Sequence, residues 1–458
     1  MNVALATSPT EAALATRFPP PEAFSHLAGD DWPEEGPVAP DPGAQRAFGR
    51  DLLGPVFVQF CQRLHIAASA FAEREARLLF VARGGLRLGV LYREWCGRTG
   101  TPPALPMGDL MISRVAAAKG CLARDFDHVA PVLVREFANG SLGYMLRCLL
   151  RGRVPEMPDI LAHCPATVGA FAAVYRADDA LGHALRAYFA EQARALAAYL
   201  DDALAGAATP VLVDSGWTGG TQAMLMRFFP ERDWHGLYFG RWDYGRGAPG
   251  HFGAIFGVAV DSIEPYANSA GQAIFVYNHL IEDPLELEMA STEGYRRDGG
   301  RAIPEGEPFD PGVLEPGPRD PMFRGILDHL AALPPDGLAF LAVERRAHAA
   351  WRRLRRMILM PRAGELPAMM VRPRSADFGR SLAVPVLLRL PEGAGLKRRL
   401  KSVGAALWRP GQVVVAFPRL HPLINGPHYL LRRVPFVWRR VAPLLGRSER
   451  LLRRLLRR

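Results

Sequence analysis

Two short apolar runs in this chain each end in a glycine-rich turn, and this repeated pattern restricts the folds that the chain can adopt. The first run, 78–82, leads into Arg-Gly-Gly at 83–85. The second, 211–213, leads into Asp-Ser-Gly-Trp-Thr-Gly-Gly-Thr at 214–221. Each pattern predicts a buried strand, a tight loop and the start of a helix, so that backbone N–H groups and a helix dipole point at one place. Loops of this kind on neighbouring parallel strands can hold the two ends of a doubly phosphorylated ligand.

The order of the remaining elements favours an α/β fold with a parallel sheet. A helix is expected over 48–71, before the first strand, and a second one over 86–96. Further strands are expected at 110–114 and 235–240, and 120–207 is expected to be a large helical insertion. Strands that alternate with helices predict parallel pairing, with ligands at the carboxyl ends of the strands. The insertion is expected to cap those ends.

Composition shifts divide the chain into four parts. Residues 1–45 are rich in proline, alanine and acids and are expected to be disordered. Residues 46–295 carry both loops and form the expected catalytic domain, and the Gly/Pro/charge-rich stretch 296–322 is expected to be a linker. Residues 323–458 form a mixed C-terminal region that ends in a basic tail.

The net charge of +10 is concentrated at the C-terminus. From Lys397 onward, sixteen lysines and arginines face the single acid Glu449, a net charge of +15, which leaves −5 for the rest of the chain. In 451–458, leucines and arginines alternate in pairs as on a basic amphipathic helix. Such a helix suits an anionic membrane surface. Nucleic acid and plain solvation are the alternatives, and nucleic acid is disfavoured because the core shows no nucleic-acid-binding signature.

The composition is that of a globular protein of the cytoplasm. No run reaches the roughly 18–20 apolar residues of a membrane span, and the first residues lack the pattern of a secretory signal. The five cysteines form no Cys-x-x-Cys pair, which fits a reducing compartment and predicts no metal framework.

The chemistry of the two loops points to phosphate binding. A phosphate group needs a curl of backbone amides, small residues and hydroxyl donors, which 218–221 supply. Asp214 stands at the end of its strand, placed for sugar hydroxyls or Mg²⁺, and Arg83 with the Gly84 and Gly85 amides suits a diphosphate. A serine-hydrolase role for Ser215 is disfavoured, because the residue two positions earlier is valine instead of the glycine of a nucleophile elbow.

Here the sequence resembles the phosphoribosyltransferases, whose ribose-phosphate and diphosphate loops have these patterns. It is similar in particular to the phosphoribosyltransferase-like glycosyltransferases of bacterial capsule and O-antigen polysaccharide loci, which are often paired or fused with haloacid-dehalogenase-type phosphatases. The matching segments are Val81–Gly85, Ser113-Arg114, Val213–Gln222, Gly236–Gly240 and Glu282 through Gly294-Tyr295. They cover about half of the chain in the family's order.

The resemblance implies a phosphoribosyltransferase-type sheet and a set of site residues. The catalytic residues would be Asp214, Arg83 and Arg114. The donor would be bound by Arg83, Gly84, Gly85, Asp214, Ser215, Gly216, Thr218, Gly219, Gly220 and Thr221. Glu282 and Tyr295 would be acceptor-side or secondary residues, and Asp214 would be the metal ligand. In two places the sequence departs from the family: Ser215 replaces a second acid, and Gly84 replaces the usual aspartate, which removes a metal or diphosphate contact.

The implied reaction is transfer of a 5-phosphoribosyl group from 5-phosphoribosyl-1-diphosphate, with Mg²⁺, to a sugar hydroxyl of a growing surface polysaccharide. The implied partners are a lipid-linked glycan acceptor and a separate phosphatase, at the inner face of the cytoplasmic membrane. The Gly84 departure favours an alternative, a non-catalytic phosphosugar-binding or scaffold protein. An ordinary nucleotide-salvage phosphoribosyltransferase is disfavoured by the large insertion and the basic tail.

Overall fold

The computed structural model describes residues 36–431 apart from 138–139, 152, 154–156, 244–247, 264–267, 307–308 and 376–382. Most of the predicted disordered segment 1–45 therefore lies outside the described residues, as does the amphipathic end of the basic tail. Within 1–45, helix α3 (Pro42–Phe48) begins earlier than expected because Asp41 caps it through the amides of Gly43 and Ala44.

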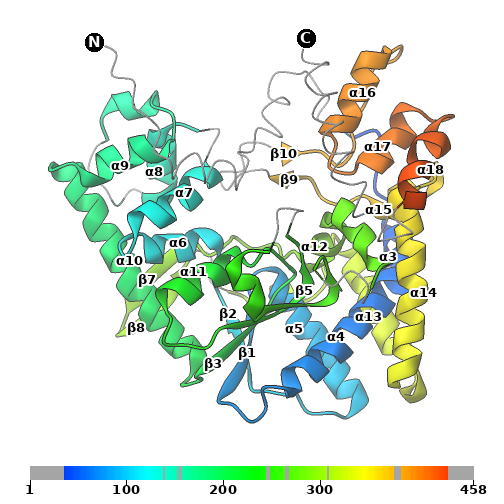
Figure 1. Cartoon of the computed structure of the whole chain (residues 1–458), viewed down its shortest axis with the longest axis horizontal. Coiled ribbons are helices and arrows are strands. Elements are labelled where there is room, and N and C mark those ends of the chain that lie inside the picture. Colours follow the sequence, from blue (N-terminus) through cyan, green and yellow to red (C-terminus); the bar gives the residue numbers. More distant parts are fainter. Residues whose placement is uncertain are drawn as a thin grey trace.

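The sheet is parallel throughout and forms the centre of a mixed α/β fold (Figure 1). Its order is β2-β1-β3-β5, with β6 on the far side of β5. Short β4 pairs with the carboxyl end of β5, whereas β3 pairs with the amino end, so β3 and β4 follow one line that is interrupted at Asp214 and Ser215. The strands are β1 (Ala76–Val81), β2 (Met107–Leu110), β3 (Thr209–Val213), β4 (Gly216–Trp217), β5 (His235–Arg241) and β6 (Ile255–Asp261).

The side of the sheet on which the chain adds strands changes between β1 and β3. From β1 it passes through α5 (Gly84–Thr99) to β2 on one side, and from β3 through α11 (Gly220–Phe228) to β5 on the other. The two helices cover opposite faces, because α5 packs in the core that contains Leu78 and Phe80, and α11 in the core that contains Leu79. Such a switch point leaves a crevice at the carboxyl ends of β1 and β3, where open α/β sheets bind ligands.

The predicted insertion is helical, but it begins earlier than expected. It consists of α6 (Arg114–Leu122), α7 (Phe126–Glu136), α8 (Leu142–Leu150), α9 (Val168–Arg176) and α10 (Ala180–Leu204). The strand predicted at 110–114 is wrong: pairing with β1 covers Met107–Leu110 and stops there. Ser113 instead caps α6 by accepting a hydrogen bond from the Ala116 amide.

Residues 296–322, which we expected to be a linker, hold regular structure. Strands β7 (Gly294–Asp298) and β8 (Arg301–Glu305) form an antiparallel hairpin, with Gly299 and Gly300 at positive φ in its turn. Gln192 of α10 binds the hairpin through both the amide and the carbonyl of Tyr295, at 2.9 and 2.8 Å. The glycines and charges of 296–305 form the turn and the exposed edge of this hairpin, and the rest of the stretch contains a short 3-10 helix at Pro311–Leu314.

The described part of the C-terminal region packs on the α/β core instead of standing apart from it. Trp351 is buried and donates to Gln59 Oε1 at 3.0 Å, and Trp408 stacks on Tyr277 with ring centres 4.9 Å apart. The region comprises α13 (Pro321–Ala332), α14 (Phe340–Leu359), α15 (Leu366–Met369), α16 (Leu396–Ala405), α17 (Arg409–Ala416) and α18 (His421–Leu431); its N-terminal partner is α4 (Gly54–Ser69). Among the described residues, no helix has the length and apolar character that a membrane crossing requires.

Candidate functional site

The two glycine-rich loops lie against each other at the switch point. A Cβ on Gly85 would come within 2.4 Å of the Val213 carbonyl oxygen, so only glycine lets the first loop approach β3 this closely. A Cβ on Gly84 would lie 3.1 Å from Ser215 Oγ. The two loops, which the sequence places on separate strands, are therefore in direct contact, and α5 and α11 begin from them.

The second loop has the backbone shape that its glycines predict. Gly219 has φ +63° and caps α11, and Gly216 has φ +114° with its Cα against the Gly240 carbonyl. The hydroxyls of Thr218 and Thr221 make no hydrogen bond to another described residue, which leaves them free to donate to a ligand.

His251, which the sequence analysis did not single out, fixes this loop from behind. Its Nε2 lies 2.7 Å from the Thr218 carbonyl oxygen, and burial lowers its pKa. A carbonyl only accepts, so Nε2 carries the proton and donates it. A neutral imidazole thus holds the loop without adding charge to it.

Asp214 sits at the break between β3 and β4, where its carboxylate accepts from the Ser215 amide at 2.7 Å through Oδ1. Burial, helped by nearby Glu282, raises the pKa of Asp214 to about 7, although the Ser215 hydrogen bonds and Arg114 oppose the shift. The group is therefore poised to hold or release a proton near neutral pH, and a bound cation would favour its ionised form.

Helix α12 (His279–Leu285) joins the two loops through two glutamates four residues apart. Glu282 accepts from Trp217 Nε1 of the second loop at 2.6 Å. Glu286, just past the helix, forms an ion pair with Arg83 of the first loop at 2.8 Å. Glu286 was missed from the sequence, because it lies just beyond the end of the helix and its partner Arg83 is about 200 positions away.

Arg83 is consequently engaged within the protein, because its Nη1 also donates to the Met289 carbonyl at 3.2 Å. Arg114 lies at the first turn of α6, with its Nε 3.9 Å from the position that a Cβ on Gly220 would take. It also pairs with Glu136 at 2.8 Å, yet its side chain keeps 46% of its surface exposed. Arg114 thus lies beside the second loop, whereas Arg83 is part of the first loop and is bound to Glu286 and Met289.

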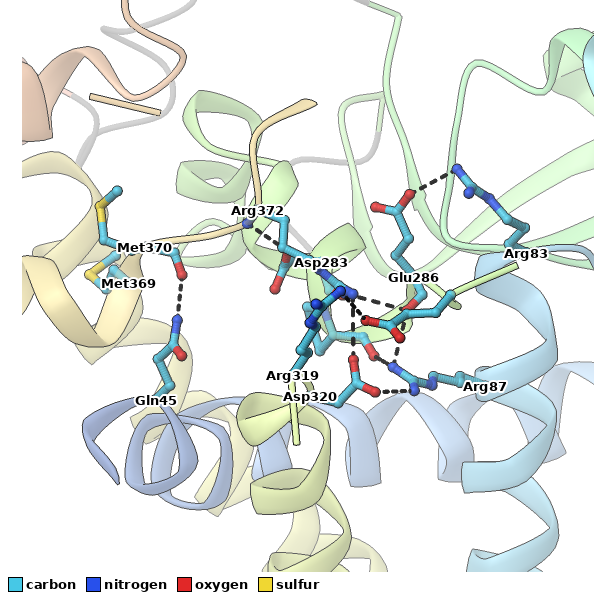
Figure 2. A network of polar contacts seen from close by, with 12 residues as sticks. Gln45, Arg83, Arg87, Asp283, Glu286, Arg319, Asp320, Met369, Met370 and Arg372 are labelled. Atoms are coloured by element: carbon cyan, nitrogen blue, oxygen red, sulfur yellow. Dashed lines mark hydrogen bonds and ion pairs between the residues drawn. The ribbon is translucent and has the colours of Figure 1, made fainter. Parts of the chain in front are cut away.

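A buried ionic network supports α12 from below (Figure 2). Arg87 of α5 binds Asp320 at 2.7 Å, with 1% and 4% of the two side chains exposed, and donates to the carbonyls of Pro284 and Glu286. From the C-terminal region, Arg372 binds the Asp283 carboxylate at 3.0 Å. Asp283 is therefore a structural residue.

Tyr295 does not reach the loops. Its side chain is fully buried, stacks on Tyr199 and donates to the Met111 carbonyl at 3.0 Å.

Met111 follows β2 and lines a cavity of about 720 Å³ at the same edge of the sheet. Other residues of the wall include Arg151, Arg153, Tyr199, Met289, Thr292, Arg296, Ile303, Glu305 and Phe309. Met289 is also the carbonyl partner of Arg83, so the cavity adjoins the first loop.

The glycines of β5 have a packing role. A Cβ on Gly236 would lie 2.4 Å from Gln222 Oε1, and one on Gly240 would lie 2.3 Å from the Trp217 ring. Gln222 is buried and accepts from the Tyr238 hydroxyl at 2.8 Å. These motif positions therefore hold α11 and the second loop on the sheet.

The residues present suit a divalent cation only together with a ligand. The described residues contain no group of three or more His, Cys, Asp or Glu side chains that could hold a metal ion alone. Mg²⁺ in phosphate-binding enzymes, however, takes one or two carboxylates and completes its shell with water and substrate phosphates. Asp214, with Oδ1 on Ser215 and Glu282 nearby, fits that arrangement.

A scan of the chain against models of protein families gave no match, and a search of curated proteins gave no significant one.

Proposed function

We propose that this protein is a phosphoribosyltransferase-like glycosyltransferase that uses 5-phosphoribosyl-1-diphosphate as donor. The observation that carries the proposal is the contact between two glycine-rich loops at the switch point of a parallel sheet, with the carboxylate of Asp214 at the start of the second loop. Two loops in contact that each present backbone N–H groups suit a ligand with a phosphate at each end, and the carboxylate of Asp214 suits the hydroxyls of a sugar.

The roles follow from position. The loop 218–221 would bind the 5-phosphate, Asp214 the ribose hydroxyls, and the first loop with Arg83 the diphosphate. In the reaction, the bond between ribose C1 and the diphosphate oxygen breaks, the acceptor oxygen bonds to C1, and the acceptor proton passes to a base. Positive charge that develops on the ribose would be stabilised by the carboxylate of Asp214 in its ionised form. Mg²⁺, when bound, would offset the charge of the leaving diphosphate, and Asp214 would be its protein ligand.

We propose further that the acceptor, a lipid-linked glycan, enters through the cavity beside β2. This cavity adjoins the first loop through Met289 and combines apolar walls with arginine and tyrosine side chains, as sugar and phosphate recognition requires. The reaction would take place in the cytoplasm at the inner face of the membrane, and a separate phosphatase would remove the 5-phosphate.

A second candidate function is a non-catalytic phosphosugar-binding or scaffold protein of a polysaccharide assembly complex. Two observations favour it: Gly84 brings no side chain to the diphosphate position, and Arg83 is already paired with Glu286. A donor would have to compete with that pair.

Calorimetry with 5-phosphoribosyl-1-diphosphate and Mg²⁺ tests the proposal. We expect micromolar binding to the native protein and at least a tenfold loss in Asp214→Asn, about 1.4 kcal/mol. Asp298→Asn, which changes an exposed carboxylate of the hairpin in the same way, is the matched control and should bind normally. Absence of binding to the folded native protein would refute the donor assignment. Binding without turnover on any lipid-linked acceptor would favour the scaffold, and turnover of a free base would indicate the salvage reaction.

A further inference from the structure

Helix α18 presents a row of apolar side chains to solvent. Leu423 and Leu430 are 74% and 59% exposed, Ile424 is 45% exposed, and Leu420 just before the helix is 52% exposed. Their spacing of three, four, seven and ten residues places them on one side of the helix together with Pro427. In a globular protein such a row normally faces the core, and a contiguous exposed row marks a surface that contacts something else.

The orientation of α18 is fixed from its opposite side. Asn425 is buried, with 5% of its surface exposed, and its Nδ2 donates to the Pro410 carbonyl of α17 at 3.1 Å. The leucine row consequently cannot turn inward without breaking this buried hydrogen bond, which would leave a polar group unsatisfied.

An arginine-lined hollow adjoins this helix. Arg352, Arg353 and Arg355 of α14 surround a space of about 330 Å³ together with Ala349 and with Tyr429 of α18. Arg352 and Arg353 are exposed, and neither lies within ion-pair distance of an acid in the part of the chain that the structure describes, although the charge of Arg353 helps to lower the pKa of Asp51. Several arginines that line one small hollow are a suitable site for a phosphate group.

The same combination of leucines and cations recurs on α16. Leu396 and Leu400 are 66% and 40% exposed and stand one turn apart among Lys397, Arg398 and Lys401. The whole stretch 393–431 carries six lysines and arginines and no acid. Helices α16, α17 and α18 gather at one corner of the molecule, beside α14 (Figure 1).

We propose that α16, α18 and the arginine hollow form a docking surface for an anionic phospholipid bilayer. The leucines would enter the boundary between headgroups and acyl chains, and the arginines would bind lipid phosphates. Charge favours a bilayer over two other possible occupants, which are the segment 432–458 of this chain and a second copy of the chain. The segment that follows, 432–458, adds ten arginines and one acid, and a second copy of the chain would bring the same cations, so both would be repelled.

Vesicle sedimentation with the full chain tests the docking surface, in parallel for neutral phosphatidylcholine and for phosphatidylcholine with phosphatidylglycerol. We expect binding only to the anionic vesicles, weakened by salt. Leu423→Ser/Ile424→Ser and Arg352→Gln/Arg353→Gln should each weaken it about tenfold, although both leave the segment 432–458 intact. Phe340→Ser/Leu341→Ser, at the distant start of α14 and equally exposed at 51% and 67%, is the matched apolar control and should bind as the native protein does.

Several outcomes would overturn the proposal. Equal binding by the native protein and both surface variants would assign membrane contact to the segment 432–458 alone. Dissociation of a native dimer by Leu423→Ser/Ile424→Ser would assign the leucine row to a second copy. Release from vesicles by millimolar inorganic phosphate would make the hollow a site for soluble anions. Circular dichroism shows whether the variants are folded, and donor binding by calorimetry, which we expect to be unchanged, separates this proposal from the one about the loops.

Discussion

Replacing Gly85 by alanine should separate the two loops and destabilise the protein. The new Cβ would lie 2.4 Å from the Val213 oxygen and 3.2 Å from the Phe80 carbonyl carbon. To reach even a 3.0 Å contact, the loop and β3 must move apart by about 0.6 Å. Both partners are backbone atoms of paired strands, so no side-chain rotation can relieve the contact, and overpacking of this kind costs about 1–3 kcal/mol.

Gly84→Ala is the matched control for this prediction. Its Cβ would meet the side chain of Ser215 at 3.1 Å, where a small rotation gives room. Both glycines lie in the first turn of α5 at ordinary φ, so the gain in helix propensity applies equally to the two variants. We therefore expect urea denaturation to place Gly85→Ala about 2 kcal/mol below Gly84→Ala in unfolding free energy, with unchanged m-values. Equal stability within about 0.5 kcal/mol would refute the reasoning that the loop contact requires Gly85.

Three further predictions address the charges around the loops. Because the pKa of Asp214 is raised to about 7, the contribution of this group to the unfolding free energy is most favourable below its usual pKa of 3.8 and is lost as the pH rises through 7. Asp214→Asn should therefore stabilise the protein at pH 8, by at most about 4 kcal/mol. In urea titrations this advantage should fade near pH 4. Glu286→Gln frees the guanidinium of Arg83 from its ion pair and should raise the affinity for a diphosphate about three- to tenfold in calorimetry; unchanged affinity would mean that Arg83 contributes nothing to the ligand. Arg87→Met leaves buried Asp320 with Arg372, at 3.5 Å, as its ion-pair partner and should lower the unfolding free energy by about 3 kcal/mol. Arg87→Met/Asp320→Leu should recover part of that loss.

The sequence predicted those elements whose signals are local. The strands β1, β3 and β5 each contain a short apolar run with a glycine or proline close to one or both of its ends. The insertion has a clear helical period, with Leu185 and Leu196 buried on its long helix. The two loops were predicted because glycine at fixed positions reports a backbone shape directly. Their mutual contact required only that β1 and β3 be neighbours.

Non-local features were beyond the sequence. The hairpin β7–β8 buries little besides Tyr295 and Ala302, so its composition is that of a linker. The strand predicted at 110–114 overlapped a helix cap, because the hydroxyl of Ser113 ends the extended run and the apolar pattern does not show this. The pairing of Arg83 with Glu286 joins residues about 200 positions apart, and no spacing rule predicts it.

The ionic support below α12 has a consequence for how this chain can be divided. Arg87 lies next to the first loop, but Asp320 and Arg372, which complete its network, come after the point where an independent catalytic part would end at 295. A chain cut there would keep the buried charges of Arg87 and Asp283 without their partners, and would expose the surface of α4 that covers Trp351. The loops therefore could not be transferred to another protein on their own. A transferred segment would need to extend to Arg372 in order to keep the same structure.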